Sequence, residues 1–525
     1  MKIEIQTGIQ IRKKQESPSL IRNIKDPKFL LMYAPQCHDP AYGVVKPEIS
    51  LGNLYLAAVL EENGFEVDIL DCCVGNERYS MEESFNHVTP LPNGLSRIGL
   101  SLETIIKDIK DYDVIGISSI FTPQTRMVEE LVRSVSSAYP EKLILMGGIN
   151  ARSQMQKFFD AGVHLICISE AERTILRIGT ILRQGSRDFS SVPGVAFLEN
   201  GKIQVNAMTE VEDNLDNLPI PARHKLPLQR IAEIARPHGG GFKSGQVERS
   251  LLYVSAMTSR GCPYKCDFCH ISGEQKDSLA GYLGKFRYQS EERVEREMAT
   301  IKEIGAKFVY IEDDSMLAKK KRALNIFRML MKFGFKLGGV NGVNLSHLHK
   351  NEGGKIVVDD EMVETMAEAG FDRLLFPVES GSQRIIDKWV SGKISHDIYD
   401  ISLLIKKANS VGIMVSSCYL IGYPDETYEE LAQTILTAKK HMDAGSEYVN
   451  FSMVTPFPGT TLYDYVVQNN LLLPGIEIAD LNWLYPSMKT IIDPYYLEFI
   501  SRKAWEFINK PERVEVLRSL APKTD

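Results

Sequence analysis

The chain has 525 residues, more than one hydrophobic core usually organises, so two or three domains are expected. Apolar residues make up 44% and charged residues 25%, a balance that excludes a disordered or fibrous chain. The 61 basic and 68 acidic residues give a formal net charge of -7 without long runs of either sign, which argues against a nucleic acid as partner.

The first twenty residues include basic side chains but no uninterrupted apolar stretch behind them, so they fail as a signal peptide. No run reaches the roughly 18 consecutive apolar residues that span a bilayer. We therefore predict a cytoplasmic protein without a membrane anchor. The 8 cysteines are too few for a disulfide scaffold, and their crowding between residues 262 and 269 indicates metal chemistry in a reducing compartment.

Residues 29–185 alternate short apolar runs with amphipathic stretches, which is the pattern of a parallel α/β sheet. The apolar runs predicted to form strands are FLLMYAP, EVDILDCC, DVIGISSIF, KLILMGGIN and HLICISE. Intervening segments such as LGNLYLAAVLEENG have helical apolar spacing and end at Gly or Pro, as crossover helices do. We predict that residues 1–185 form a doubly wound α/β domain with a five-stranded parallel sheet.

Residues 186–249 are rich in turn-forming residues and show little periodicity, so we interpret them as a linker. A second alternation follows, with apolar strands near residues 251, 308, 337, 373, 414 and 449. This pattern predicts a partial (β/α)6 barrel over 250–465, in which Ser290 and Gly305 begin and end a helix. The irregular, aromatic-rich residues 466–525 are expected to cap one end of the barrel.

The segment SAMTSRGCPYKCDFCHISG places Cys262, Cys266 and Cys269 directly after the first barrel strand. Gly261 and Pro263 disfavour a continuous helix there, so the spacing favours a loop wrapped around a metal cluster. Thiolates are the usual ligands of iron–sulfur clusters, which normally take four of them. Because only three are local here, one iron of such a cluster would stay open to a substrate.

On ligand chemistry alone, a structural zinc site completed by His270 is an alternative, and inert free thiols are a weaker one. The position of the loop favours catalysis, because active sites gather at the carboxyl ends of barrel strands. We therefore predict a catalytic cluster rather than a structural zinc ion.

The three cysteines and Phe268 match C-x3-C-x-aromatic-C, and from this motif through the barrel the chain resembles the radical S-adenosylmethionine (SAM) superfamily. The resemblance implies that Cys262, Cys266 and Cys269 bind a [4Fe–4S] cluster and that SAM chelates the open iron. It also implies reductive cleavage of SAM to a 5′-deoxyadenosyl radical, with an electron donor such as flavodoxin or ferredoxin as partner.

Further candidate residues follow later barrel strands. Asp314 lies in IEDDSM, and Glu379 and Gly381 lie in FPVESGS, where Glu379 resembles the family's SAM-contacting glutamate in an E-x-G motif. Carboxylates there are suited to hold the ammonium or ribose hydroxyls of SAM, and glycine permits close backbone approach. Gly422 lies in LIGYPDET, which resembles the superfamily's G-x-P-x-E turn, although a plain helix-starting turn explains Glu426 equally well.

In the first domain, Ser118 after the third strand and Gly147 and Gly148 after the fourth mark the predicted ligand crevice, because such domains bind beyond the carboxyl ends of their strands. A plain Gly-Gly turn is the alternative. The order of domain, linker and barrel resembles the cobalamin-binding radical SAM enzymes over nearly the full chain. ISEAERTIL takes the place of that family's G-E-G-E element, which implies a cobalamin contact by Glu170, although both glycines are replaced.

The phrases DYDVIGISSIF, TSRGC and LIKKANSVGI resemble the cobalamin-dependent radical SAM methyltransferases of the fosfomycin-pathway type. This resemblance implies methylation of an unactivated carbon, or of phosphorus, in a small metabolite or natural-product intermediate, via methylcobalamin and a 5′-deoxyadenosyl radical. One alternative is a cobalamin-dependent radical SAM cyclase or rearrangement enzyme. Another is a non-catalytic cobalamin or redox sensor, which the intact cysteine triad and Glu379 disfavour.

Overall fold

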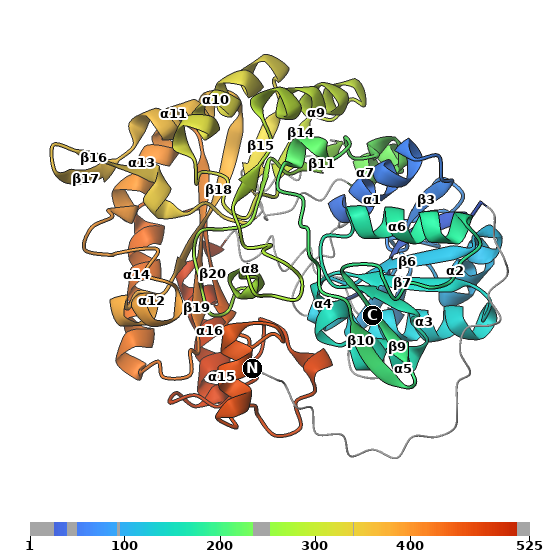
Figure 1. Cartoon of the computed structure of the whole chain (residues 1–525). Coiled ribbons are helices and arrows are strands. Elements are labelled where there is room, and N and C mark those ends of the chain that lie inside the picture. Colours follow the sequence, from blue (N-terminus) through green and yellow to red (C-terminus); the bar gives the residue numbers. More distant parts are fainter. Residues whose placement is uncertain (1–25, 39–49, 92–94, 235–251, 340, 512–525) are drawn as a thin grey trace.

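The computed structural model describes residues 26–38, 50–91, 95–234, 252–339 and 341–511. The outer ends of the predicted first and last segments, and residues 235–249 of the predicted linker, lie outside these ranges. Within them, no helix combines the length and the apolar character needed to cross a membrane. Figure 1 shows two α/β units beside each other, with the short helix α8 (His270–Gly273) drawn between them.

The N-terminal unit is built on a seven-stranded sheet of order β10-β9-β8-β7-β6-β1-β3. Its five strands from β8 to β3 are parallel neighbours, which confirms the predicted doubly wound sheet. These strands are β1 (Phe29–Tyr33), β3 (Val67–Asp71), β6 (Val114–Ser118), β7 (Leu143–Gly147) and β8 (Leu165–Cys167). Four of them are mostly buried because helices cover both faces of the sheet, whereas β3 at the edge buries only Val67 and Leu70.

Two apolar clusters hold these helices against the sheet. One cluster joins it to α2 (Leu102–Asp108), α3 (Thr125–Ala138) and α5 (Met155–Ala161), and α4 (Ile149–Ser153) follows β7 directly. The other cluster joins the opposite face to α1 (Leu51–Glu62) and α6 (Glu172–Arg183). The crossover helices therefore lie on both sides, as a doubly wound topology requires.

Part of the segment interpreted as a linker belongs to this sheet. The strands β9 (Val195–Glu199) and β10 (Lys202–Val205) form a hairpin, and β9 pairs antiparallel with β8. Asn200 and Gly201 both have positive φ, 51° and 74°, as the turn of a two-residue hairpin requires. The linker interpretation is therefore wrong for these residues, although the helix α7 (Leu228–Ile234) and irregular chain follow them.

The second unit is a six-stranded parallel sheet in the sequential order β11-β14-β15-β18-β19-β20, which confirms the predicted partial barrel. Its strands are β11 (Tyr253–Ala256), β14 (Phe308–Ile311), β15 (Lys336–Gly339), β18 (Phe371–Glu379), β19 (Met414–Ile421) and β20 (Tyr448–Met453). Its helices are α9 (Glu291–Glu303), α10 (Lys320–Leu330), α11 (Asp360–Ala369), α12 (Gln383–Trp389), α13 (Ile401–Ser410) and α14 (Tyr428–Asp443). One large apolar cluster joins these strands and helices.

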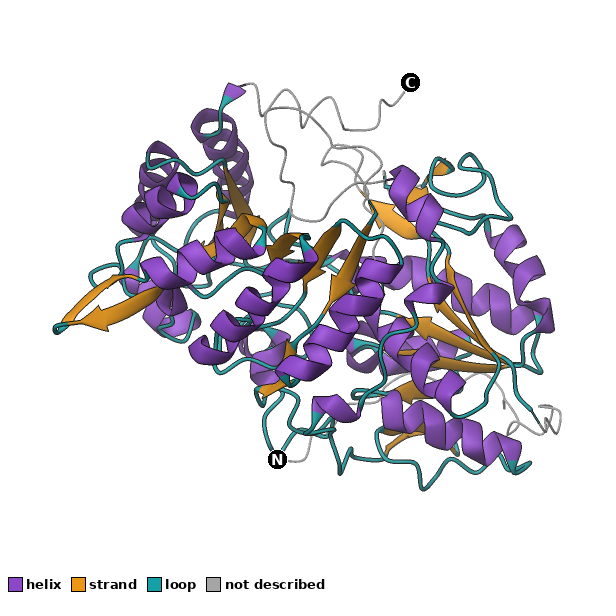
Figure 2. Cartoon of the chain, turned by 90° about the horizontal axis from the view of Figure 1, so that it is seen from above, coloured by secondary structure: helices purple, strands orange, loops and turns teal. Residues whose placement is uncertain are grey.

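The first barrel helix begins and ends as predicted. The Ser290 hydroxyl accepts a hydrogen bond from the Arg293 amide at 3.1 Å, and Gly305 follows α9 with a φ of 81°. Three short antiparallel pairings complete the fold: β2 (Gln36–His38), β4 (Val88–Pro90) and β5 (Ser96–Ile98); β12 (Ser259–Arg260) and β13 (Arg287–Tyr288); β16 (His349–Glu352) and β17 (Lys355–Val358). The β16–β17 hairpin projects from the barrel in both views (Figures 1 and 2).

The C-terminal segment contacts both units. It contains α15 (Thr461–Gln468) and α16 (Pro494–Ile508), which lie below the barrel in Figure 1. Asn509 exchanges two hydrogen bonds with the backbone of Val449 in β20, at 2.9 and 3.0 Å. Arg126 of α3 pairs with Asp480, and with Glu477 at 3.2 Å. The segment therefore links the edge of the barrel to the N-terminal sheet unit.

Candidate active site

The cysteine triad lies on an irregular loop beyond the carboxyl end of β11, as predicted. Cys266 is buried, and Cys262 and Cys269 are half-buried. The loop enters through Gly261, which has a φ of 83°, and a side chain there would approach the Lys285 carbonyl oxygen to 2.3 Å. The Cys269 amide donates to the Cys266 carbonyl oxygen at 3.1 Å, so the last two cysteines share a tight turn. The helix α8 begins only after Cys269.

The three thiols share one electrostatic environment. Burial raises the pKa of all three, and for Cys266 to about 12. The charges of Cys262 and Cys269 both act on Cys266 and raise the pKa of its thiol further. Bound iron would offset the cost of three buried thiolates, because metal binding displaces the thiol protons. The donor set therefore fits an iron–sulfur cluster with one open iron.

His270 does not join the triad. Its Nε2 atom lies 3.0 Å from the Pro458 carbonyl oxygen, and its ring packs on Phe457 at 6.3 Å. Across the described ranges, no three or more His, Cys, Asp and Glu side chains are arranged to hold a single metal ion. A cluster does not need that arrangement, because each of its iron atoms takes its own thiolate. The zinc alternative therefore finds no support in the position of His270.

Two adjacent acids after β14 hold the chain that leads into the triad. Asp313 accepts hydrogen bonds from the Thr258 amide at 2.6 Å, the Thr258 hydroxyl at 2.7 Å and the Ser259 hydroxyl at 2.5 Å. Asp314 accepts from the Gly261 amide at 2.9 Å, and burial raises its pKa to about 6. Asp314, a candidate SAM contact from the sequence, thus positions the loop that carries the thiols.

Glu379 ends β18 in a conformation that only glycine adopts easily, with a φ of 68°. Its carboxylate lies 2.6 Å from the ammonium of Lys393, and the two side chains are 9% and 11% exposed. Strained residues persist where their surroundings hold them, and they cluster at active sites and ligand clamps. The sequence singled out Glu379 but not Lys393, which lies outside every motif recognised there.

The fold gives each of the remaining barrel candidates, Gly381, Gly422 and Phe268, a structural role. A side chain at Gly381 would approach the Gln433 carbonyl oxygen of α14 to 2.5 Å, so packing against this helix already requires glycine. Gly422 has a φ of 84°, and its amide donates to the Glu426 carboxylate at 2.6 Å, which closes the predicted turn. Phe268 packs edge-on against the buried ring of Tyr423 at 6.5 Å, next to the triad.

The predicted crevice of the N-terminal unit contains a pocket. The strand order reverses between β1 and β6, and ligands of such sheets bind at this switch point. A pocket is lined there by residues that follow the two strands, among them Tyr33, Gln36, Ser118 and Phe121. Gly148 follows β7 with a φ of 101°, and a side chain there would approach the Ser119 carbonyl oxygen to 2.3 Å.

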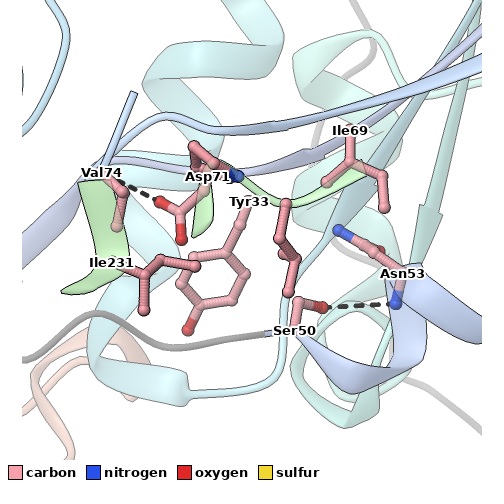
Figure 3. Close-up of a pocket in the computed structure, with 9 residues that line it drawn as sticks. Tyr33, Ser50, Asn53, Ile69, Asp71, Val74 and Ile231 are labelled. Carbon is pink, nitrogen blue, oxygen red and sulfur yellow. Dashed lines mark hydrogen bonds between the residues drawn. The ribbon is translucent and has the colours of Figure 1, made fainter. Parts of the chain in front are cut away.

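A second pocket, which the sequence did not indicate, lies at the carboxyl ends of β1 and β3 (Figure 3). Its lining is mostly apolar and comprises Tyr33, Ser50, Asn53, Ile69, Asp71, Val74, Leu226, Pro227 and Ile231. The Asp71 carboxylate accepts from the Cys73 and Val74 amides at 2.8 and 3.0 Å. Tyr33 lines both pockets, whereas Ser118, Gly147 and Gly148 do not line this one.

Glu170, the predicted cobalamin contact, joins the two units. Its carboxylate is 2.7 Å from the Arg287 guanidinium and 3.1 Å from that of Arg260. Arg260 also pairs with Glu172 at 2.7 Å, and it immediately precedes the glycine that leads into the triad. The structure thus gives Glu170 an interdomain contact that the sequence did not indicate.

Comparison with known proteins assigns a family model to each unit. The model of the radical SAM superfamily matches residues 257–438, and the model of the B12 binding domain matches residues 44–178. The barrel match contains the whole triad, and the N-terminal match contains β3 and β6 but begins after β1. The order of the two matches agrees with the order of the two sheets in the fold.

Two curated relatives are similar over most of their length. An uncharacterized methyltransferase of Pyrococcus horikoshii is 28% identical over 414 residues, with 78% of this chain and 79% of the relative covered. Cytidylyl-2-hydroxyethylphosphonate methyltransferase of Streptomyces wedmorensis is 28% identical over 463 residues, with 81% and 79% covered. The solved structure of OxsB, a cobalamin-dependent SAM radical enzyme with aqua-cobalamin and SAM bound, aligns with a TM-score of 0.66 at 16% identity, covering 94% of this chain and 70% of OxsB. The last likeness concerns the fold alone.

Proposed function

Because this chain is a radical SAM protein with a B12-binding domain, we propose that it is a cobalamin-dependent radical SAM methyltransferase. Its cofactors are a [4Fe–4S] cluster, SAM and cobalamin. The proposed substrate is a small metabolite or natural-product intermediate that is methylated at an unactivated carbon or at phosphorus. Two similar proteins named as methyltransferases, one of which acts on a phosphonate, support this choice.

The observation that carries the proposal is the junction between the triad loop and the N-terminal unit. Arg260 lies two residues before Cys262 and pairs with Glu170 and Glu172 of the N-terminal unit. Ser169 of the same unit donates to the Ala280 carbonyl oxygen at 2.6 Å, just beyond the triad. A radical-forming site tied directly to a B12-binding unit is what radical-dependent methyl transfer requires.

When bound, the cluster with SAM supplies a carbon-centred radical, and cobalamin supplies the methyl group. We propose that Cys262, Cys266 and Cys269 hold the cluster and that Glu379 accepts hydrogen bonds from SAM. The amides of the crevice, near Ser118 and Gly148, would face the cobalamin. Cys266 is buried, which keeps water from this part of the site, and exclusion of water protects a reactive radical from side reactions.

Two further parts of the proposal concern the setting of the reaction. Reductive cleavage of SAM consumes a low-potential electron, so we propose a flavodoxin or ferredoxin as electron donor. We also propose a cytoplasmic location, where such donors and reduced thiols are found. A small molecule rather than a macromolecule is the proposed substrate, in keeping with the similar methyltransferases.

An anaerobic incubation tests the proposal. Protein reconstituted with iron, sulfide and cobalamin is mixed with SAM and a low-potential reductant, and the products are assayed for methylated cobalamin and 5′-deoxyadenosine. We expect both products. Deoxyadenosine with cobalamin bound but never methylated would favour a cyclase or rearrangement enzyme, and failure to bind cobalamin would leave only the radical SAM assignment.

A further inference from the structure

The hydroxyl of Tyr423 is buried beside the triad loop and has no hydrogen-bond partner among the described residues. We propose that it donates a hydrogen bond to the sulfur atom of Cys266 when the cluster is bound, and that this bond raises the reduction potential of the cluster. The inference rests on the proposed function and deepens it, because it names a residue that tunes the cluster without binding iron or SAM.

Two aromatic rings hold Tyr423 against the triad loop. Its ring stacks on Trp389 at 6.3 Å and meets Phe268 edge-on at 6.5 Å. Phe268 is the second residue after Cys266 in the loop, whereas Tyr423 follows β19 and is therefore carried by the barrel. The position of Tyr423 beside the loop is thus fixed by packing from both sides.

Cys266 packs on the turn that follows Trp389. The Cys266 thiol lies 3.5 Å from the Val390 carbonyl oxygen, and the Asp267 amide donates to the Trp389 carbonyl oxygen at 3.0 Å. Cys266 and Tyr423 also belong to the same buried apolar cluster. One turn of the barrel therefore contacts both the cluster ligand and the tyrosine ring.

Binding of iron reverses the hydrogen-bonding role of Cys266. As a thiol, Cys266 donates to the Val390 carbonyl oxygen. A metal-bound thiolate has lost this proton and can only accept hydrogen bonds. The contact with Val390 then brings two acceptors together, so the buried sulfur atom is stabilised by a donor from another direction.

Tyr423 offers such a donor. Its side chain is fully buried, and a buried hydroxyl without a partner costs free energy that a phenylalanine ring in the same place would not cost. Burial raises the pKa of the Tyr423 hydroxyl well above its ordinary value, and the charges of Glu379, Glu426 and Cys266 raise it further. The hydroxyl therefore keeps its proton in this setting and can act as a donor.

Glu426 is the rival acceptor for this hydroxyl. It lies in the same turn, where its amide donates to the Tyr423 carbonyl oxygen at 3.1 Å, and its Oε1 atom has no partner among the described residues. A bond from Tyr423 to Glu426 would leave the cluster unaffected. A bond to Cys266 would stabilise the reduced cluster more than the oxidised one, because the reduced cluster is more negative, and hydrogen bonds to the sulfur atoms are one of the factors that set cluster potentials.

A redox titration of the reconstituted holoprotein, followed by electron paramagnetic resonance without SAM, distinguishes the two acceptors. Tyr423→Phe keeps the ring and its packing but removes the donor. We expect the equilibrium constant for one-electron reduction of the cluster to fall at least threefold, which makes the midpoint potential more negative by about 28 mV or more. Tyr419→Phe is the matched control, because Tyr419 is a fully buried tyrosine of β19 whose hydroxyl lies 2.6 Å from the Nδ1 atom of His441. It should leave the potential unchanged.

A second variant decides the question if Tyr423→Phe fails to load iron. Tyr423→3-fluorotyrosine keeps the ring and the hydroxyl but makes the hydroxyl a stronger donor, so the potential should become less negative. Electron–nuclear double resonance should also detect coupling between its fluorine and the reduced cluster. An unchanged potential in the variant that loads iron, or the same shift in Tyr419→Phe, would overturn the inference. A wild type that assembles no [4Fe–4S] cluster would contradict the proposed function itself, whereas an unchanged potential would contradict only the role of Tyr423.

Discussion

Glu170 and Glu379 are both acids that the sequence assigns to cofactor binding, and both are paired with cations from elsewhere in the chain. Glu170 lies between two arginines of the barrel, so its pairing joins two folding units. Glu379 lies within the barrel against Lys393, beside three thiols that a cluster would make negative. The role of an acid in a motif thus depends on which cation the fold brings to it and on what else that cation faces.

Substitution of a thiol has the largest expected effect, and the loss should be confined to the SAM site in the barrel. Cys266→Ala should abolish SAM cleavage while cobalamin binding persists, because Cys266 lies in the barrel and not in the B12-binding unit. Iron content, bound cobalamin and 5′-deoxyadenosine report the three quantities. Retained cleavage would contradict the assignment of the cluster ligands.

Glu379→Gln tests the barrel side without touching a thiol. The amide keeps the shape but loses the charge, so Lys393 is left buried without its partner, and SAM affinity should fall by at least tenfold. Cobalamin affinity should stay within twofold of wild type. Both are measured by titration of the holoprotein. A loss of cobalamin affinity with SAM affinity unchanged would instead assign Glu379 to cobalamin binding.

Glu170→Gln tests the interdomain side. Arg260 and Arg287 should keep only part of their pairing with residue 170. We therefore expect both cofactors to bind, but SAM cleavage to be less tightly coupled to methyl transfer. The ratio of 5′-deoxyadenosine to methylated product should rise several-fold, measured by chromatography of single reactions. Glu210→Gln is the control, because Glu210 forms an exposed pair with Arg173 at 3.4 Å. An unchanged ratio in Glu170→Gln would argue that the network only stabilises the fold.

The smallest expected effect concerns Glu426, a fully buried acid that forms no ion pair with any residue in the described ranges. Burial raises its pKa to about 7 from an ordinary value near 4.5. Between these values the unfolded chain has released a proton that the folded chain retains, so stability should fall as pH rises through this window. Glu426→Gln, which keeps an acceptor for the Gly422 amide, should remove this fall, an effect of the order of 2 kcal/mol. Apparent melting temperatures at pH 5 and pH 8 provide the test, and identical pH profiles would refute it.

The sequence predicted the parallel sheets because their strands are long apolar runs separated by capped helices, as the Ser290 cap of α9 illustrates. It missed the hairpin of β9 and β10, whose strands are short and partly exposed. The Asn200–Gly201 turn was the available signal, since this pair favours a two-residue hairpin. The apolar periodicity was judged over a long window, in which two such short strands give no clear pattern.

The candidate site was predictable where a local motif carries it, and the triad is the clearest case. Lys393 was not, because nothing near it in the sequence suggests chemistry, and only the folded chain shows that its side chain meets Glu379, 14 residues earlier. Gly381 and Gly148 were singled out for close approach of the backbone to a cofactor, which stays a prediction, and the fold gives both positions a separate reason to need glycine. The neighbours that require it, the Gln433 and Ser119 carbonyl oxygens, are visible only in the folded chain.

The contact between Arg126 and Asp480 joins residues that are 354 positions apart. During synthesis the N-terminal sheet can form early, because its strands are complete before the barrel begins. The clamp between the units, however, must wait until the C-terminal segment has left the ribosome. The pairs that Glu170 forms with Arg260 and Arg287 can form before it, so synthesis would join the two units in two stages, first at the triad loop and then at the C-terminal segment.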